Sequence, residues 1–100
     1  MNGLTRKLLT IVTESVLERV LPEDLERLGA RGFTITEARG KGSRGMRGGT
    51  WDENSNIRIE ILCDTATAEA LTAHLQKHYY DDYAMVMFVS DVTVLRSEKF

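Results

Sequence analysis

The residues best suited to chemistry lie in one glycine-rich basic segment near the middle of the chain. The segment Arg39-Gly-Lys-Gly-Ser-Arg44, followed by Arg47, carries four positive charges in nine residues and no acidic residue. Glycines let the backbone approach a ligand closely and turn its N–H groups inward. Lysine and arginine side chains add charge-assisted hydrogen bonds to phosphate or carboxylate oxygens. The segment therefore predicts a site for an anion.

The charge of the whole chain favours a local anion site over a general nucleic-acid surface. The net charge is −2, so the residues outside this basic cluster sum to −6 once its four charges are subtracted. Such a cluster in an acidic chain indicates a small anionic ligand. The motif itself is weak, because it is neither GxxxxGK[ST] nor a GxGxxG that opens a helix. A solvated glycine-rich hairpin loop remains an alternative interpretation.

Length and composition indicate one globular domain of 100 residues, of which 42% are hydrophobic. No apolar run approaches the roughly 20 residues that a membrane-spanning helix needs. Cys63 is the only cysteine, so an intrachain disulfide is impossible and we expect a buried, inert thiol. This cysteine usage is typical of a reducing compartment, and we expect a cytoplasmic protein.

Apolar periodicity predicts the elements that position the basic segment. Alternating or continuous apolar runs predict strands, and i, i+3, i+4 spacing predicts helices. We expect strands at 7–13, 33–38, 57–62 and 85–95, and helices at 15–28 and 65–79. Ser15 and Thr65 are the predicted N-caps, Gly29 the predicted stop, and Pro22 predicts a kink or two short helices. Residues 40–56 show no periodicity and predict a long mobile loop.

The element order predicts an α+β fold, a ferredoxin-like βαββαβ sandwich with an antiparallel sheet and both helices on one face. The first and last strands are apolar on both faces. A large apolar patch is rare on a monomer, so we expect the second face to pack against other subunits.

Several short segments carry a resemblance to a known family. Residues 32–44 (GFTITEARGKGSR) and 59–62 (IEIL), in this element order, resemble the PII signal-protein family over about Lys7 to Arg96. Residues 11–14 (IVTE), 40–44 (GKGSR) and 82–84 (DYA) are most similar to its inorganic-carbon branch. That branch includes the bicarbonate-transporter regulators and the carboxysome-associated PII proteins.

The resemblance implies a single PII-like domain over residues 1–100 that forms a homotrimer. Adenine nucleotides would bind in the clefts between subunits, with ADP or AMP favoured and cyclic AMP or ATP as alternatives. Bicarbonate is the implied second ligand. The loop at about 40–56 (the T-loop) would signal to a protein partner such as a bicarbonate transporter or a carboxysome component. The loop lacks the tyrosine that nitrogen-regulatory relatives modify. The implied protein is not an enzyme and needs no cofactor or metal.

The resemblance also implies roles for individual residues. The phosphates would be held at the base of the T-loop, by Gly40, Lys41, Gly42, Ser43, Arg44 and Arg47. The base and ribose would be bordered by Thr34, Glu60 and Leu62.

Other functions have less support in the sequence. A small nucleotide-hydrolysing enzyme would need a carboxylate pair, a nucleophile with its base or a metal site, and none is evident. A nucleic-acid-binding module would rest on four basic residues and Trp51 alone. Trp51 is equally consistent with packing on the sheet and with anchoring a partner. His74 and His78 share a helix face but lack an obvious third metal ligand.

Overall fold

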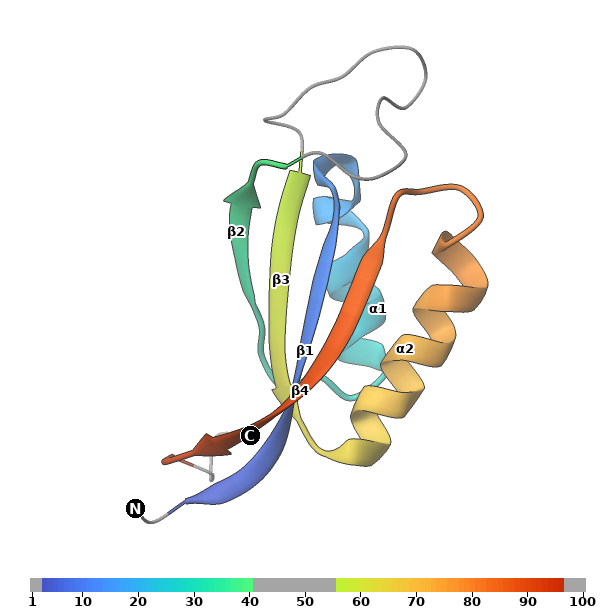
Figure 1. Cartoon of the computed structure of the whole chain (residues 1–100). Helices are drawn as coiled ribbons and strands as arrows, with labels where there is room; N and C mark the ends of the chain where they lie inside the picture. The colour runs from blue at the N-terminus through green and yellow to red at the C-terminus, as the bar shows by residue number, and fades with distance from the viewer. Residues whose placement is uncertain (1–2, 41–55, 97–100) are drawn as a thin grey trace.

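The protein folds as a four-stranded antiparallel sheet with its helices on one face (Figure 1). The structure, a computed structural model, describes residues 3–40 and 56–96. The strand order is β2-β3-β1-β4. The elements in chain order are β1 (Leu4–Glu14), the 3₁₀ helix η1 (Ser15–Arg19), α1 (Leu21–Arg27), β2 (Thr34–Ala38), β3 (Asn56–Cys63), α2 (Thr65–Tyr79) and β4 (Val86–Val94). The predicted ferredoxin-like βαββαβ arrangement is confirmed.

One face of the sheet forms the core together with the helices. Ile57, Ile59 and Ile61 alternate along β3 and are 0–1% exposed, as the two-residue period of a half-buried strand requires. Leu9 and Ile11 of β1 lie on the same face. The helices contribute buried leucines, namely Leu21 and Leu25 of α1 and Leu71 and Leu75 of α2. Each such side chain stabilises the fold by roughly 1.5–3 kcal/mol.

The helix ends correct two predictions from the sequence. Ser15 is not an N-cap, because β1 runs on to Glu14 and Ser15 is already the first residue of η1. Thr65 is not the cap of α2 either: Asp64 accepts a hydrogen bond from the backbone N–H of Thr67 at 2.8 Å. This bond lowers the pKa of Asp64.

Two other local predictions are confirmed. The Pro22 segment forms two short helices rather than one, with Pro22 in the first turn of α1, where its missing N–H costs little. Gly29 follows α1 with a φ of 110°, a left-handed conformation that favours glycine at a helix C-terminus.

Asp24 links the two helices through side-chain contacts. Its carboxylate accepts hydrogen bonds from the Tyr79 hydroxyl at 2.6 Å and from Arg27 Nη2 at 2.9 Å. His74 Nε2 lies 3.4 Å from the same carboxylate, and its ring centroid lies 4.4 Å from that of His78. Burial alone would raise the pKa of Asp24, but the hydrogen bonds from Tyr79, Arg27 and His74 outweigh it and lower that pKa.

The Tyr79 hydroxyl should titrate late. Burial and the hydrogen bond to the Asp24 carboxylate raise the pKa of Tyr79 to about 12 from an ordinary value of 10. The folded state therefore holds this proton more tightly than the unfolded state. The resulting stabilisation is complete below pH 10 and is lost as the pH rises toward 12.

Replacing Tyr79 should remove that late titration step. We expect Tyr79→Phe to abolish a tyrosinate absorbance change near pH 12 and to lower the free energy of unfolding by about 1 kcal/mol, the usual worth of one hydrogen bond. Ultraviolet titration and urea unfolding at neutral pH measure the two effects. Tyr80→Phe, on the next residue, is the control and should keep the late step. If Tyr80→Phe loses the late absorbance change and Tyr79→Phe keeps it, the assignment of the raised pKa to Tyr79 is contradicted.

Candidate functional site

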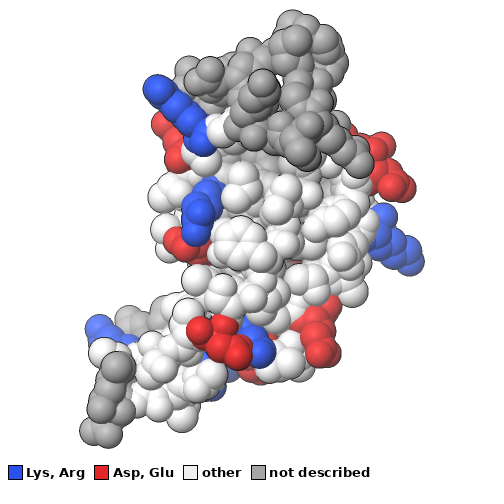
Figure 2. Space-filling view, viewed as in Figure 1, with Lys and Arg blue, Asp and Glu red and all other residues white. Residues whose placement is uncertain are grey.

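The sheet face that points away from the helices is the face that the sequence analysis expects to pack against other subunits. We call it the open face. It carries Leu8, Thr10 and Val12 of β1, Arg58, Glu60 and Leu62 of β3, and Val86, Phe88 and Val92 of β4. Val86 and Phe88 remain 58% and 46% exposed. Figure 2 looks onto this face and shows a broad band of uncharged atoms across the sheet. The expected apolar second face is therefore present.

A row of mostly polar residues crosses the middle of the open face. Strand register places Thr34, Glu60, Thr10 and Phe88 in one row across the four strands. Arg58 Nη2 lies 3.6 Å from Glu60 Oε2, and the Arg58 guanidinium lies 6.0 Å from the centroid of the Phe88 ring. Thr10 is fully buried in this row, and its hydroxyl has no hydrogen-bond partner among the residues that the structure describes.

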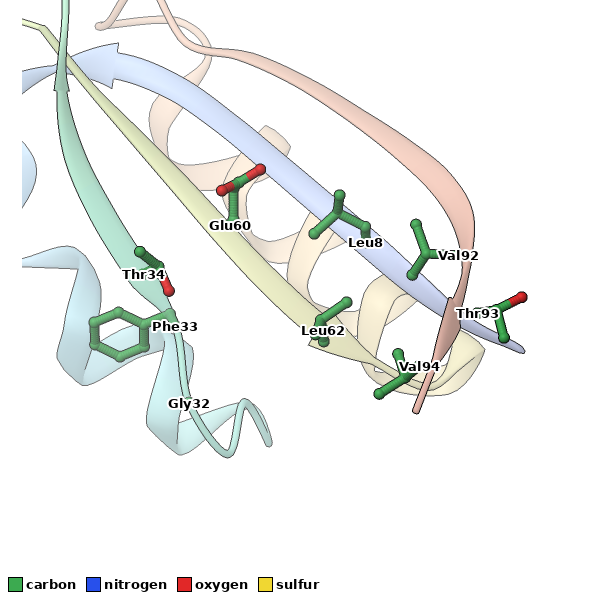
Figure 3. Close-up of a pocket in the computed structure, with 9 residues that line it drawn as sticks. All are labelled: Leu8, Gly32, Phe33, Thr34, Glu60, Leu62, Val92, Thr93 and Val94. Atoms are coloured by element: carbon green, nitrogen blue, oxygen red, sulfur yellow. The ribbon is translucent and has the colours of Figure 1, made fainter. Parts of the chain in front are cut away.

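A hollow of about 530 Å³ opens at one end of this face (Figure 3). Thr34, Glu60 and Leu62 line it, and these are the three residues expected to border a base and ribose. Figure 3 shows them on β2 and β3, with Leu8 of β1 and Val92 of β4 on the same side of the sheet. A mostly apolar wall with a few polar groups is the usual construction of a small-molecule site.

Sequence reasoning missed the rest of this wall. Leu8, Phe33 and Val94 also line the hollow, together with Gly32, Val92 and Thr93. The alternation of β1 and β4 indicates that Leu8 and Val92 leave their strands on one face. No local pattern in the sequence predicts that side chains on this face line the same hollow as Thr34 of β2.

Of the predicted phosphate residues, the structure describes Gly40 alone. Gly40 is the last described residue before the T-loop, whereas Lys41, Gly42, Ser43, Arg44 and Arg47 lie outside the described residues, as does Trp51. Ala38 and Asn56, the stems of the loop, pair with each other. Thr34 and Gly40 are separated by six residues, which span about 20 Å of extended chain. Of the predicted nucleotide residues, the structure therefore brings together Thr34, Glu60 and Leu62, while Gly40 is not part of the hollow.

The remaining candidates offer no reactive centre in the described part of the chain. Cys63 is 5% exposed, and burial together with the nearby negative charge of Asp64 raises the pKa of its thiol. Within residues 3–40 and 56–96, no three His, Cys, Asp or Glu side chains are grouped to hold a metal ion. None of the helices in these ranges is long and apolar enough to cross a membrane.

The fold defines a ferredoxin-like α+β domain, and a comparison with known families shows which family the chain belongs to. The family described as nitrogen regulatory protein P-II matches residues 6–99. This match spans almost the whole chain, so the protein belongs to the PII family. PII signalling proteins are non-enzymatic regulators, which confirms the expectation that the protein is not an enzyme.

Solved structures of similar proteins agree with this membership. A protein from Thermus thermophilus that is described as a PII-like signalling protein is 46% identical to this chain, with a TM-score of 0.83. The match covers 100% of this chain and 99% of that one. CPII from Thiomonas intermedia, bound to ADP, AMP and bicarbonate, is 29% identical, with a TM-score of 0.84 and coverage of 99% and 96%. GlnK of B. subtilis, at 18% identity and a TM-score of 0.64, shares the fold, with coverage of 92% and 84%.

Proposed function

We propose that this protein is a nucleotide-sensing regulator that binds an adenine nucleotide and bicarbonate and signals through its T-loop. ADP and AMP are the favoured nucleotides, and cyclic AMP and ATP are alternatives. The observation that carries the proposal is the hollow lined by Thr34, Glu60 and Leu62, in a chain similar along its length to CPII, which binds ADP, AMP and bicarbonate.

The hollow has the chemistry to receive a base and ribose. Leu62 and Leu8 offer apolar surface to the faces of a purine, and burying that surface favours binding. The Glu60 carboxylate accepts hydrogen bonds, which suits the amino group of adenine or the hydroxyls of ribose. Thr34 is the register partner of Glu60 on the neighbouring strand, and its hydroxyl can donate or accept a hydrogen bond.

The proposal has two subunits combine to complete each site. Six residues separate Thr34 from Gly40, a chain length of up to about 20 Å when fully extended. A nucleotide whose base occupies the hollow of one subunit would then place its phosphates at the T-loop base of another, as the family resemblance implies. A homotrimer, the assembly that PII proteins form, would give three such clefts and would cover the open face.

The proposal places one PII-like domain over residues 1–100 in the cytoplasm, with a T-loop at about 40–56. Nucleotide and bicarbonate would bind beside each other at the base of the T-loop, where its cations reach both. Binding that orders the loop would present a changed surface to a partner of inorganic-carbon metabolism, such as a bicarbonate transporter or a carboxysome component.

Thr34→Val tests the hollow as the nucleotide site. The substitution keeps the shape of the side chain but removes its hydroxyl, and we expect adenine nucleotides to bind about tenfold more weakly, the effect of one lost hydrogen bond. Calorimetry with AMP, ADP, ATP and cyclic AMP measures this. Thr36→Val is the matched control, because Thr36 lies on the same face of β2 outside the hollow. A folded trimer that binds none of these nucleotides would overturn the proposal.

The binding of bicarbonate is tested separately, by its effect on the affinity for ADP. If both ligands order the T-loop, each should increase the affinity of the other by the same factor. Titrations of ADP with and without bicarbonate, at fixed pH and ionic strength, measure that factor. Equal affinities would remove bicarbonate from the proposal and leave the nucleotide site standing.

A further inference from the structure

An ion pair lies beside the hollow on the open face. Arg58 and Glu60 are two residues apart on β3, so both side chains leave the strand on the same side. Arg58 Nη2 lies 3.6 Å from Glu60 Oε2. Glu60 lines the hollow (Figure 3), whereas Arg58 does not. The guanidinium of Arg58 therefore reaches the hollow only through the carboxylate of Glu60.

An aromatic ring contacts the same guanidinium. The guanidinium carbon of Arg58 lies 6.0 Å from the centroid of the Phe88 ring, within the range of a cation–π contact. Register places Val12 of β1 opposite Arg58, and Thr10 of β1 opposite Phe88. The Arg58 side chain therefore extends across β1 toward β4. Thr10 lies between Glu60 and Phe88 in the register row and is fully buried, so the side chains around it close over β1.

This arrangement suits a carboxylate that a ligand will cover. A glutamate side chain has several rotatable bonds, and ordering it only when the ligand binds reduces affinity. A covered carboxylate also loses its hydration, which costs free energy unless an opposite charge stays beside it. Arg58 meets both needs, because it orders the Glu60 carboxylate and keeps a positive charge next to it. Phe88 restricts the guanidinium in turn.

We infer that Arg58 is a positioning residue of the nucleotide site, which holds the Glu60 carboxylate in the orientation that accepts a hydrogen bond from the nucleotide. The inference rests on the proposed function and adds to it a residue that lies outside the hollow. Ordering one long side chain before binding increases affinity by roughly three- to tenfold.

Arg58→Met is the direct test, because methionine keeps an apolar stem against Phe88 and removes the charge. We expect calorimetry to show AMP binding about three- to tenfold more weakly. Arg58→Lys keeps the charge and should recover part of the loss. Arg27→Met is the matched control and should leave the affinity unchanged. Arg27 also pairs with a carboxylate, that of Asp24 at 2.9 Å, but lies in the helical layer.

A double-mutant cycle separates positioning from a general effect on the fold. The carboxylate is absent from a Glu60→Ala background, so Arg58→Met should cause no further loss of AMP affinity there. Phe88→Leu is a second variant, which keeps apolar surface and removes the ring. It should weaken AMP binding by a smaller factor that also disappears in the Glu60→Ala background. Sedimentation velocity checks that the compared variants share one assembly state.

Two results would overturn the inference and leave the proposed function intact. One is Arg58→Met binding AMP as tightly as the wild type does. The other is an equal loss of affinity with and without the Glu60 carboxylate. If Arg58→Met does not assemble, the same comparison with Phe88→Leu decides. A folded wild-type trimer that binds no adenine nucleotide overturns both the inference and the proposed function.

Discussion

Phe88→Asp is expected to convert the assembled protein into monomers. Phe88 lies on the open face, 46% exposed in the single subunit, in the row that also holds Thr10 and Glu60. A trimer that covers this face would bury the new carboxylate in each copy, and an unpaired buried charge costs several kcal/mol. Sedimentation velocity at micromolar concentration should show three chains of 11.3 kDa for the wild type and one for the variant.

The control makes the same kind of change away from the open face. Val16 is 69% exposed on η1, in the helical layer, and Val16→Asp should leave the trimer intact. Circular dichroism of each variant separates dissociation from unfolding. If the Phe88→Asp variant remains trimeric, or if the wild type sediments as a monomer, assembly through the open face is contradicted.

Two binding-defective variants should restore each other when their subunits mix. Leu62→Trp fills the hollow, and Lys41→Ala with Arg44→Ala removes two cations from the loop base; neither trimer should bind AMP or ADP measurably. In mixed trimers an intact hollow of one subunit meets an intact loop of another. Each mixed trimer should regain one of its three sites, which is about a quarter of all sites before the mixed trimers are purified, if each site takes its hollow and its loop from different subunits.

The experiment uses co-expression of the two variants with different affinity tags, so that only mixed trimers are purified and titrated. Each variant co-expressed with itself is the control and should stay inactive. The expected restoration follows from the proposal that each site lies between two subunits. Mixed trimers without any restored binding would place both parts of the site in a single subunit and contradict the two-subunit arrangement.

Local patterns in the sequence determined most of the secondary structure. The alternation of Ile57, Ile59 and Ile61 predicts both the strand and its buried face, because side chains on a strand alternate with a period of two. Pro22 and Gly29 act within one turn of their own position, so their effects on α1 were predictable. The caps at Ser15 and Thr65 were wrong by one residue, because the end of the preceding strand or turn decides which residue caps a helix.

The family resemblance predicted one part of the candidate site, and the strand register decided the other part. Thr34, Glu60 and Leu62 were singled out from short motifs, and the structure places all three on one hollow. Leu8 and Val94 were not, because they come from strands far away in the sequence. Alternation fixes which face a side chain takes but not which residue it pairs with.

Only the tertiary structure decided the contacts between residues distant in the sequence. Glu14 meets Ala84 across 70 residues, and Asp24 meets Tyr79 across 55. Neither pair has a local signal, because each depends on how the sheet and helices pack as whole elements. The sequence by itself determined a βαββαβ chain with a basic loop and an apolar second face. The packing of the sheet decided which residues meet at the hollow, since the strand register brings Leu8 of β1 and Val92 of β4 to the same face as Thr34 and Glu60.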